Sequence, residues 1–204
     1  ATQGHGDHWF GADTLATRFG ARVVASPGTI EQMRRNVELR PAFWDPLFPG
    51  QLPPTPVTAE APDGGVVELE GSALRIIDVG HSDTDDTSVV HVPDLDLVVA
   101  GDVLYNGVHQ FLREGGDGGI ARWRGALDLV AALRPRVAVA GHADRALDHD
   151  ADRIIAETRA YLDAAEELFA AHSTALGFFQ AMLARFPSRL NAGALWSSAT
   201  ALIP

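Results

Sequence analysis

The sequence predicts an α/β fold, in which helices pack against a sheet of short strands. Runs of β-branched residues lie between residues 66 and 100, and segments with apolar residues at helical spacing lie on both sides of them. Polar residues stand at the ends of several runs, where the loops of an α/β sheet form ligand sites. We therefore expect one layered domain over residues 1–204, with a helical C-terminal region from about residue 149.

The N-terminal third alternates short elements with irregular chain. Residues 1–8 are predicted to end a strand and form a tight loop, and residues 12–19 to form a short helix. A short strand over residues 22–25 and a helix over residues 29–39 follow. Residues 41–62 contain seven prolines, which exclude a regular helix or a central strand, so we predict an ordered surface excursion.

The remaining elements follow from the same patterns. Four short strands are predicted over residues 66–69, 74–79, 88–92 and 97–100. Apolar residues at helical spacing predict helices over residues 120–130, 154–169 and 176–186. A further strand, over residues 137–140, is predicted between the first two of these helices.

The composition restricts the function classes. The net charge is −11, so nucleic acids and anionic membranes are poor partners, and we expect a small-molecule substrate. The chain has no cysteine, which excludes disulfides, thiolate metal sites and cysteine nucleophiles. No apolar run approaches the roughly 20 residues of a membrane span, and no signal peptide is visible. We expect a cytoplasmic protein, although the missing initiator methionine leaves a removed leader open.

The first eight residues carry the densest group of metal-binding side chains. His5, Asp7 and His8 fall within four residues, and Gly4 and Gly6 permit a sharp backbone turn that lets these side chains converge. Imidazole and carboxylate without thiolate suit zinc or another borderline divalent metal. The segment therefore predicts a metal site.

Three further candidate ligands lie far along the chain. His81, Asp102 and His142 each follow a glycine at the end of a predicted strand or in the loop after it. Loops at strand ends converge while the sheet stays rigid, so these side chains are expected to join the N-terminal group. The aspartates that follow His81 are interpreted as a polar turn: Asp83, Asp85 and Asp86.

The N-terminal segment, Gln3-Gly4-His5-Gly6-Asp7-His8, resembles the His-x-His-x-Asp-His motif of the metallo-β-lactamase superfamily. The three later residues resemble that family's remaining ligands, in the expected order, so the resemblance spans residues 2–142. It implies a four-layer αβ/βα sandwich with a dinuclear site between two sheets, binding one or two Zn²⁺ or other divalent cations per chain. By position it implies that Gln3, His5 and His81 face one metal, that Asp7, His8 and His142 face the other, and that Asp102 bridges them.

The chain departs from the family pattern at two points. Gln3 stands where the family has histidine, and its neutral, harder oxygen makes it either a weak zinc ligand or no ligand. Some family members with glutamine here work with the second metal alone. The family also has a strand-rich segment before the motif. We therefore expect part of the N-terminal sheet to be lacking, with the sheet short or completed by another copy of the chain, or the chain to be a trimmed product.

The chemistry that the resemblance implies is hydrolysis. A divalent cation lowers the pKa of its bound water from 15.7 to about 7, and the resulting metal-bound hydroxide would attack an ester, lactone, thioester or amide carbonyl. Asp7 or Asp102 would orient the nucleophile and pass its proton to the leaving group. Two alternatives remain open. One is a metal-poor, non-catalytic binding or regulatory member of the fold, and the other is an iron-dependent oxidation that needs the position weakened by Gln3.

Aromatic and polar residues follow two of the ligand groups. Trp9 and Phe10 come directly after the N-terminal motif, and Tyr105 and His109 come shortly after Asp102. Such residues line apolar substrate pockets that carry a few polar contacts. Each of the four is expected either to line such a pocket or to pack within the fold.

Overall fold

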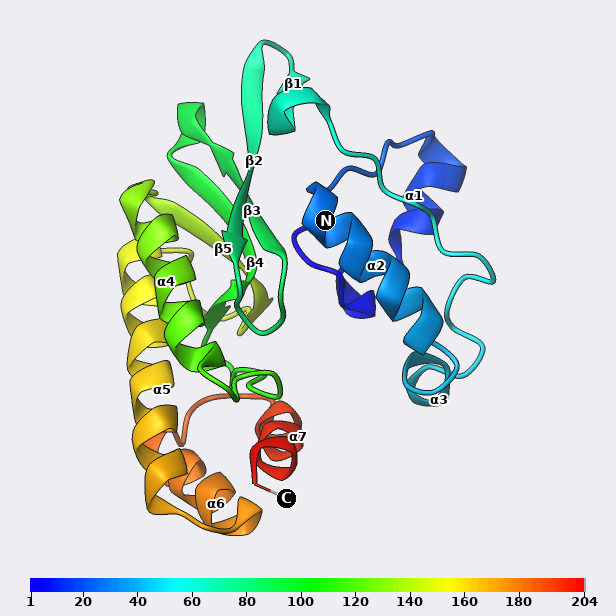
Figure 1. Cartoon of the computed structure of the whole chain (residues 1–204). Coiled ribbons are helices and arrows are strands. Elements are labelled where there is room, and N and C mark those ends of the chain that lie inside the picture. Colours follow the sequence, from blue (N-terminus) through cyan, green and yellow to red (C-terminus); the bar gives the residue numbers. More distant parts are fainter. Residues whose placement is uncertain (204) are drawn as a thin grey trace.

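The β-branched runs in the middle of the chain form one five-stranded sheet in the computed structural model, which describes residues 1–203 (Figure 1). Its strands are β1 (Val66–Leu69), β2 (Ser72–Gly80), β3 (Thr87–Val92), β4 (Leu97–Asn106) and β5 (Val137–Ala143). They lie in sequence order, and neighbours are antiparallel except for the parallel pair of β4 and β5. The five strands predicted after residue 65 are confirmed, and the last two run past their predicted ends.

The parallel pair brings two candidate ligands to one end of the sheet. Asp102 lies within β4 and His142 within β5, and Tyr105 pairs with His142 in the register. The register shifts between Gly101 and Tyr105, and Gly101 has a left-handed φ of +53°. Irregularities of this kind re-aim side chains next to functional sites. The bend therefore positions Asp102 toward the end of β5.

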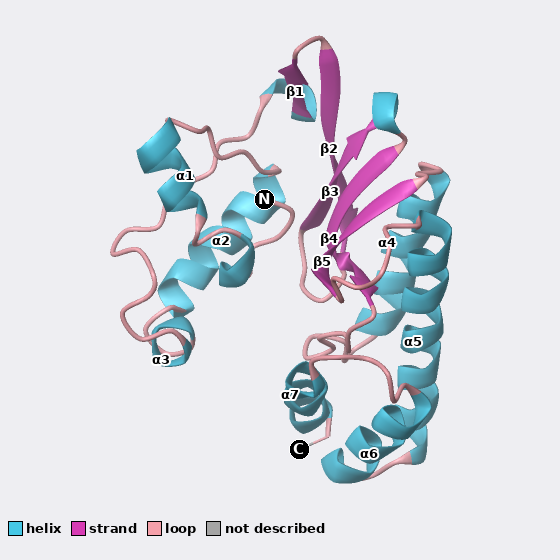
Figure 2. Ribbon diagram, turned by 180° about the vertical axis from the view of Figure 1, so that it is seen from behind, coloured by secondary structure: helices cyan, strands magenta, loops and turns pink. Residues whose placement is uncertain are grey.

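Two long helices cover one face of the sheet. α4 (Gly119–Ala132) and α5 (Ala151–Ala171) lie along it side by side in both views (Figures 1 and 2). Trp123 of α4, Leu162 of α5 and Val98 of β4 are completely buried in the core between them. The helical spacing of the sequence correctly predicts both helices, because their apolar faces are the ones that meet this core.

The C-terminal region continues with α6 (Ala175–Arg185) and α7 (Ala192–Leu202), which lie below the sheet in Figure 1. α6 is predicted by its apolar spacing, but α7 is not. α7 begins at Asn191, which has a φ of +62° and whose side chain accepts a hydrogen bond from the amide of Ala194 (3.4 Å). Among residues 1–203, no helix combines the length and the apolar character that crossing a membrane requires.

The N-terminal segment forms a second group of helices on the other side of the sheet (Figure 1). These are α1 (Ala12–Phe19), α2 (Pro27–Leu39) and α3 (Trp44–Leu47). Ser26 caps α2 by accepting a hydrogen bond from the amide of Thr29 (3.3 Å). A separate apolar cluster holds the group together and includes Trp9, Phe10, Ile30, Met33 and Trp44. The proline-rich excursion over residues 41–62 is confirmed as largely irregular, interrupted by α3.

Two strands predicted near the N-terminus are wrong. Residues 1–8 contain a single 3₁₀ turn, Gly6–His8, and residues 22–25 contribute only an isolated bridge between Val24 and Glu60. A Cβ on Gly4 would collide with Gln32, and one on Gly6 would collide with the ring of Phe10. Neither glycine has a positive φ, so both serve close packing rather than a left-handed turn. The α/β class is confirmed, and residues 1–203 form a single five-stranded sheet, whereas the four-layer αβ/βα sandwich stays a prediction.

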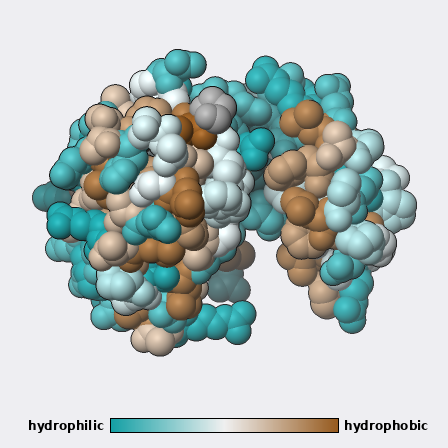
Figure 3. All heavy atoms as spheres, turned by 90° about the horizontal axis from the view of Figure 1, so that it is seen from below, coloured by the Kyte–Doolittle hydropathy of each residue, from teal (hydrophilic) through white to brown (hydrophobic). Residues whose placement is uncertain are grey.

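A hollow separates the N-terminal helices from the C-terminal helices. Figure 3 views it from below, with the N-terminal helices on the right and apolar surface on both sides. The exposed apolar side chains in or near α3, α6 and α7 are Phe43, Leu47, Phe48, Leu176, Leu190 and Trp196. The chain before α1 crosses to the sheet, because the amide of Ser88 donates to the carbonyl of Thr2 (2.7 Å). This contact brings the N-terminal motif to the end of the sheet.

Truncating Trp123 tests the packing of α4 on the sheet. The ring is completely buried, and its indole nitrogen donates to the carbonyl of Val103 (3.0 Å). Trp123→Ala is expected to lower the free energy of unfolding by about 3–5 kcal/mol, because it opens a cavity in the core. Phe19→Ala is the matched control, since Phe19 is 71% exposed and should change stability by no more than about 0.5 kcal/mol. Equal urea midpoints for the two variants would contradict this packing.

Candidate metal centre

Four predicted ligands meet where the N-terminal loop touches the ends of β4 and β5. The Nε2 atoms of His8 and His142 lie 3.2 and 3.3 Å from Oδ2 of Asp102. Oδ2 of Asp7 lies 3.6 Å from His8 Nε2 and 3.4 Å from His142 Nε2. One donor atom from each of Asp7, His8 and His142 lies within 4.8 Å of the other two. We call Asp7, His8, Asp102 and His142 the four-donor cluster.

Asp7, His8 and His142 of the four-donor cluster form a group that could hold a divalent cation, and Asp102 lies next to both imidazoles. Donor atoms arranged tetrahedrally at zinc–ligand distances of 2.0–2.1 Å are separated by about 3.3 Å, close to the spacings given above. Asp102 Oδ1 and His8 Nε2 are buried, and neither has a hydrogen-bond partner among the described residues. A Cβ on Gly141 would collide with Asp102 Oδ1, so the missing side chain leaves room for that carboxylate. These observations indicate a site shaped for a positive charge.

The charges within the four-donor cluster shift one another's pKa values. Hydrogen bonds to Asp102 and Asp7 raise the pKa of His142 to about 10, against the effect of burial. Burial lowers the pKa of His8, but the nearby carboxylates of Asp102 and Asp7 outweigh it and raise that pKa. Burial alone would raise the pKa of Asp102, yet His142 and His8 keep it well below its usual range. Without a cation, the imidazoles therefore carry the protons that balance the carboxylates.

Tyr105 contacts two members of the four-donor cluster, His142 and Asp102. Its ring is buried and lies 5.7 Å from the ring of His142, at an interplanar angle of 23°. Its hydroxyl donates to Asp102 Oδ2 (2.8 Å). Burial, followed by the charge of Asp102, raises the pKa of the hydroxyl well above 10, so it stays a donor. Tyr105 thus orients Asp102 and does not line either cavity described below.

Gln3 lies beside this cluster, and its amide oxygen faces the backbone amide of Asp102. The side chain is completely buried. Its amide nitrogen donates to Asp83 Oδ2 (3.0 Å) and reaches Asp102 Oδ2 (3.5 Å). Its amide oxygen accepts a hydrogen bond from the backbone amide of Asp102 (3.2 Å). Both halves of the amide are therefore used within the protein.

Both ring nitrogens of His5 lie within hydrogen-bond distance of carboxylates. Its Nδ1 lies 2.9 Å from Asp83 Oδ2, and its Nε2 lies 3.3 Å from Glu114 Oε1. Burial lowers the pKa of His5, but the two carboxylates outweigh it and raise that pKa to about 10. An imidazole that donates from both nitrogens has no lone pair for a metal. We call Gln3, His5, Asp83 and Glu114 the Gln3 cluster.

His81 forms no hydrogen bond or ion pair with a described member of either cluster, although its charge contributes to lowering the pKa of Glu114. Its Nδ1 lies 2.6 Å from Asp85 Oδ1, and its Nε2 is buried with no hydrogen-bond partner among the described residues. A Cβ on Gly119 would lie 2.9 Å from that Nε2, so the ring points at the start of α4. Within residues 1–203, no hydrogen bond or ion pair joins His81 to Gln3, His5 or Asp102. The assignment of Gln3, His5 and His81 to a first metal position stays a prediction, and these residues are not part of the group of converging donor atoms formed by Asp7, His8 and His142.

The sequence analysis does not identify two carboxylates of the Gln3 cluster, Asp83 and Glu114, as site residues. Asp83 is interpreted there as part of a turn, yet it is 1% exposed and bonds to both Gln3 and His5. Burial and the charge of Asp102 raise its pKa. Glu114 lies in the loop before α4, where it also accepts a hydrogen bond from Thr84 (2.9 Å). The position of Asp83 two residues after His81 is a sequence signal for a site residue. No local sequence pattern identifies Glu114 as one.

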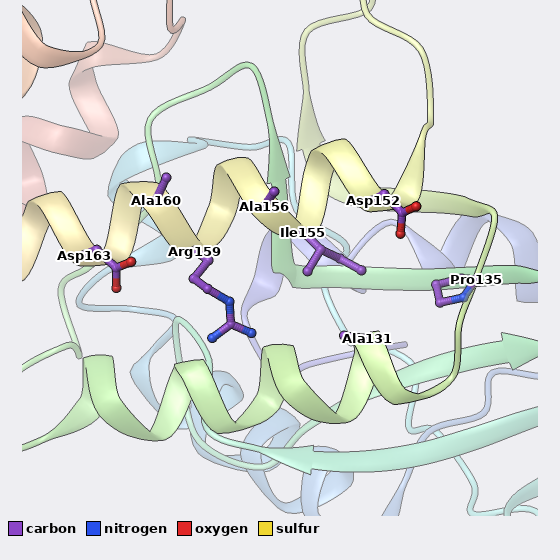
Figure 4. A pocket seen from close by; sticks show the side chains of 8 residues that line it. All are labelled: Ala131, Pro135, Asp152, Ile155, Ala156, Arg159, Ala160 and Asp163. Atoms are coloured by element: carbon purple, nitrogen blue, oxygen red, sulfur yellow. The ribbon is translucent and has the colours of Figure 1, made fainter.

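The predicted pocket residues separate in the structure. Phe10 lines a cavity of about 420 Å³ that also includes Asp7. Trp9 is buried and donates to the carbonyl of Gly4 (2.9 Å), whereas His109 is buried against the hydroxyl of Tyr161 (3.0 Å). A second cavity, of about 430 Å³, lies between α4 and α5, where Arg159 points toward α4 (Figure 4). It contains none of the predicted site residues.

Comparison with known proteins identifies similar sequences and folds. A family model described as the metallo-beta-lactamase superfamily matches residues 2–142. A metallo-beta-lactamase from Pontibacter korlensis is 21% identical, with a TM-score of 0.57 over 79% of this chain and 66% of that one. A metallo-beta-lactamase family protein from Thermus thermophilus is 23% identical, with a TM-score of 0.60 over 95% of this chain and 68% of that one. A beta-lactamase domain protein from Burkholderia ambifaria is 18% identical, with a TM-score of 0.63 over 98% and 66%.

The similarity to these solved structures covers part of their length and concerns the fold. The chain spans about two thirds of the length of those structures. At identities below 25% they show the fold alone. No curated protein sequence matches the chain significantly.

Removing one hydroxyl tests how the four-donor cluster is supported. Tyr105→Phe keeps the buried ring but removes the donor to Asp102 Oδ2. Loss of a group that orients a ligand lowers metal affinity by about 10–100-fold, and we expect that range for Zn²⁺. Tyr161→Phe is the matched control, because its hydroxyl contacts His109 and no member of the four-donor cluster. Equal Zn²⁺ affinities for both variants in a chelator competition would remove Tyr105 from this role.

The protonation of His142 predicts a pH-dependent metal affinity. Its pKa of about 10 means that the metal-free imidazole is protonated at neutral pH. A cation must displace that proton, so affinity should rise by about tenfold per pH unit for each proton displaced, up to about pH 10. Zn²⁺ titrations between about pH 6 and pH 9, with proton release measured by calorimetry in two buffers, check this expectation. An affinity independent of pH would show that the imidazoles are not the ligands.

Proposed function

The chain belongs to the metallo-β-lactamase superfamily, and on that basis we propose that it is a hydrolase that uses one divalent cation, Zn²⁺ in the first place, at the four-donor cluster. The convergence of His8, His142, Asp7 and Asp102 carries the proposal. Two imidazoles and two carboxylates without a thiolate suit zinc, and other divalent metals remain compatible with them. The satisfied hydrogen bonds of the Gln3 cluster support one cation per chain rather than two.

The two carboxylates of the cluster have different surroundings and would have different roles. A divalent cation bound there supplies Lewis acidity, which brings the pKa of water from 15.7 to about 7. Asp102 is 2% exposed and bonded by its neighbours, so it orients the imidazoles. The Asp7 side chain is 37% exposed and its pKa is lowered, so it is an ionised group that can accept a proton from water and deliver it.

The reaction is the addition of water to an acyl group. The water oxygen bonds to the carbonyl carbon, and the bond from that carbon to the leaving oxygen, sulfur or nitrogen breaks. The leaving group departs with the proton that Asp7 accepts from water. Esters, lactones, thioesters and amides of small molecules all satisfy this scheme, and no serine or cysteine nucleophile is needed.

A metal-poor binding protein is the second candidate. The Gln3 cluster favours it, because an imidazolium and an amide there satisfy the carboxylates without a metal. The two candidates differ in metal content after purification without chelator. Roughly one bound divalent metal per chain supports the hydrolase, whereas less than about 0.2 supports the binding protein.

Removing one imidazole tests the proposed function directly. His142→Ala is expected to abolish hydrolysis of small thioesters and esters and to weaken Zn²⁺ binding by more than the roughly 10–100-fold typical of supporting residues. His149→Ala is the matched control, because His149 is exposed and its side chain forms no ion pair or hydrogen bond among the described residues. Metal content by elemental analysis and thiol release give the two readouts. Full activity of His142→Ala would end the assignment.

A further inference from the structure

The cavity that contains Phe10 adjoins the proposed reaction centre. It encloses about 420 Å³ between the N-terminal loop, the first turn of α1 and the chain around α3. Its walls include Asp7, Phe10, Gly11, Trp44, Phe48 and Leu52. Cavities of roughly 300–1,000 Å³ are typical of small-molecule sites. Asp7 belongs both to this wall and to the four-donor cluster, so a group bound in the cavity lies one side chain from the reacting centre.

Three aromatic side chains, those of Phe10, Trp44 and Phe48, belong to the wall of the cavity. The rings of Phe10 and Trp44 meet edge to face with their centroids 5.7 Å apart. Trp44 and Phe48 are nearly parallel, with an interplanar angle of 18° and centroids 6.4 Å apart. Phe10 and Trp44 are buried, whereas Phe48 is 39% exposed at the rim. Such rings favour a further aromatic ring in stacked or edge-to-face contact.

The charges around the cavity exclude an anionic ligand group. The charged residues in its wall are Asp7 and Asp13, and no arginine belongs to that wall. Arg40 lies 6.0 Å from the centroid of the Phe10 ring, but Asp45 (2.7 Å) and the carbonyl of Pro53 already bind its guanidinium. A carboxylate placed here would meet Asp7 and Asp13 but no arginine or lysine of the wall, and a divalent cation held at the four-donor cluster would already be balanced by the carboxylates of Asp7 and Asp102. The cavity therefore disfavours acyl groups that carry a carboxylate, as β-lactam antibiotics do.

We propose that this cavity binds the aromatic acyl group of an uncharged ester or thioester and thereby sets the substrate preference of the hydrolase. The proposal rests on the proposed function, because it takes the four-donor cluster as the place where the acyl carbonyl reacts. Phe48 at the rim is then a specificity-determining residue. Gly11 belongs to the wall, and a Cβ there would meet no atom within 4 Å.

Three thioesters of N-acetylcysteamine test the preference. The phenylacetyl compound offers a neutral ring, the acetyl compound offers no ring, and the succinyl compound carries a carboxylate. Water cleaves the C–S bond of each, and the chain has no cysteine, so every thiol that appears comes from the substrate. For the metal-loaded protein we expect kcat/KM to be about tenfold or more higher for phenylacetyl than for acetyl, because a ring is buried, and lowest for succinyl.

Two pairs of variants assign that preference to the cavity. Phe48→Ala and Gly11→Leu should each lower the ratio of phenylacetyl to acetyl kcat/KM by about tenfold, the first by removing a wall and the second by filling the space. Phe19→Ala and Gly125→Leu should keep the wild-type ratio. Phe19 is exposed outside the cavity, and Gly125 of α4 has open space around it. Equal rates for phenylacetyl and acetyl, with no effect of Phe48→Ala, would overturn the proposal while leaving the hydrolase function standing.

A binding measurement separates the two proposals if hydrolysis fails. Phenylacetamide, which is neutral, and phenylacetate, which is anionic, are compared by saturation-transfer NMR with the wild type and with Gly11→Leu. Binding of phenylacetamide alone, lost in Gly11→Leu, supports the cavity assignment even without turnover and counts against the hydrolase function. Absence of phenylacetamide binding, or tighter binding of phenylacetate, overturns the cavity assignment.

Discussion

The buried carboxylate of Asp102 is the constraint on which the arrangement of the site depends. A charge that is only 2% exposed costs several kcal/mol unless oppositely charged or donor groups surround it. Its Oδ2 meets His8 from the N-terminal loop, His142 from β5 and the hydroxyl of Tyr105 from its own strand. The backbone amide of Asp102 is bound as well, by the amide oxygen of Gln3. The loop, β4 and β5 must therefore keep one relative position for this charge to remain buried.

The two clusters around Asp102 balance their charges differently. In the Gln3 cluster, Asp83 is met by an imidazole and by an amide N–H, and Glu114 is met by the same imidazole and by Thr84. In the four-donor cluster, Asp102 Oδ1 and His8 Nε2 are buried without hydrogen-bond partners among the described residues. A cation gains most where such atoms are unsatisfied, and it gains little where donors already occupy the acceptors. Under the proposed function, this difference, together with glutamine in place of histidine at position 3, supports one cation per chain rather than two.

The sequence predicts what local patterns determine. Strand runs and the motif His5-Gly6-Asp7-His8 predict that four of the candidate ligands lie close together, as they do in the structure, because β4 and β5 are parallel neighbours. Sequence analysis fails where a side chain's contacts are with residues far away in the sequence. Glu114 binds His5 across 109 positions of sequence, and the orientation of the Gln3 amide is set by carboxylates about 80 to 100 positions away. α7 escapes prediction because it starts with small residues that give little periodicity. The strand expected at residues 22–25 finds only Glu60 as a partner, so its β-branched residues do not form a ladder.

The same junction connects the four-donor cluster to the wall of the cavity that contains Phe10. Phe10 and Trp44 belong to the apolar cluster of the N-terminal segment, whereas Asp102 and His142 belong to strands packed on the main core. The hydrogen bonds from Ser88 to Thr2 and from Asp102 to Gln3 fix one group against the other. A cation held by Asp7 and His8 on one side and by Asp102 and His142 on the other would add its binding free energy to that junction. Under the proposed function, Gln3 has a structural role even if it does not bind the metal. It fixes the distance between the aromatic wall and the carboxylates, and thus the place where an acyl group meets the reacting centre.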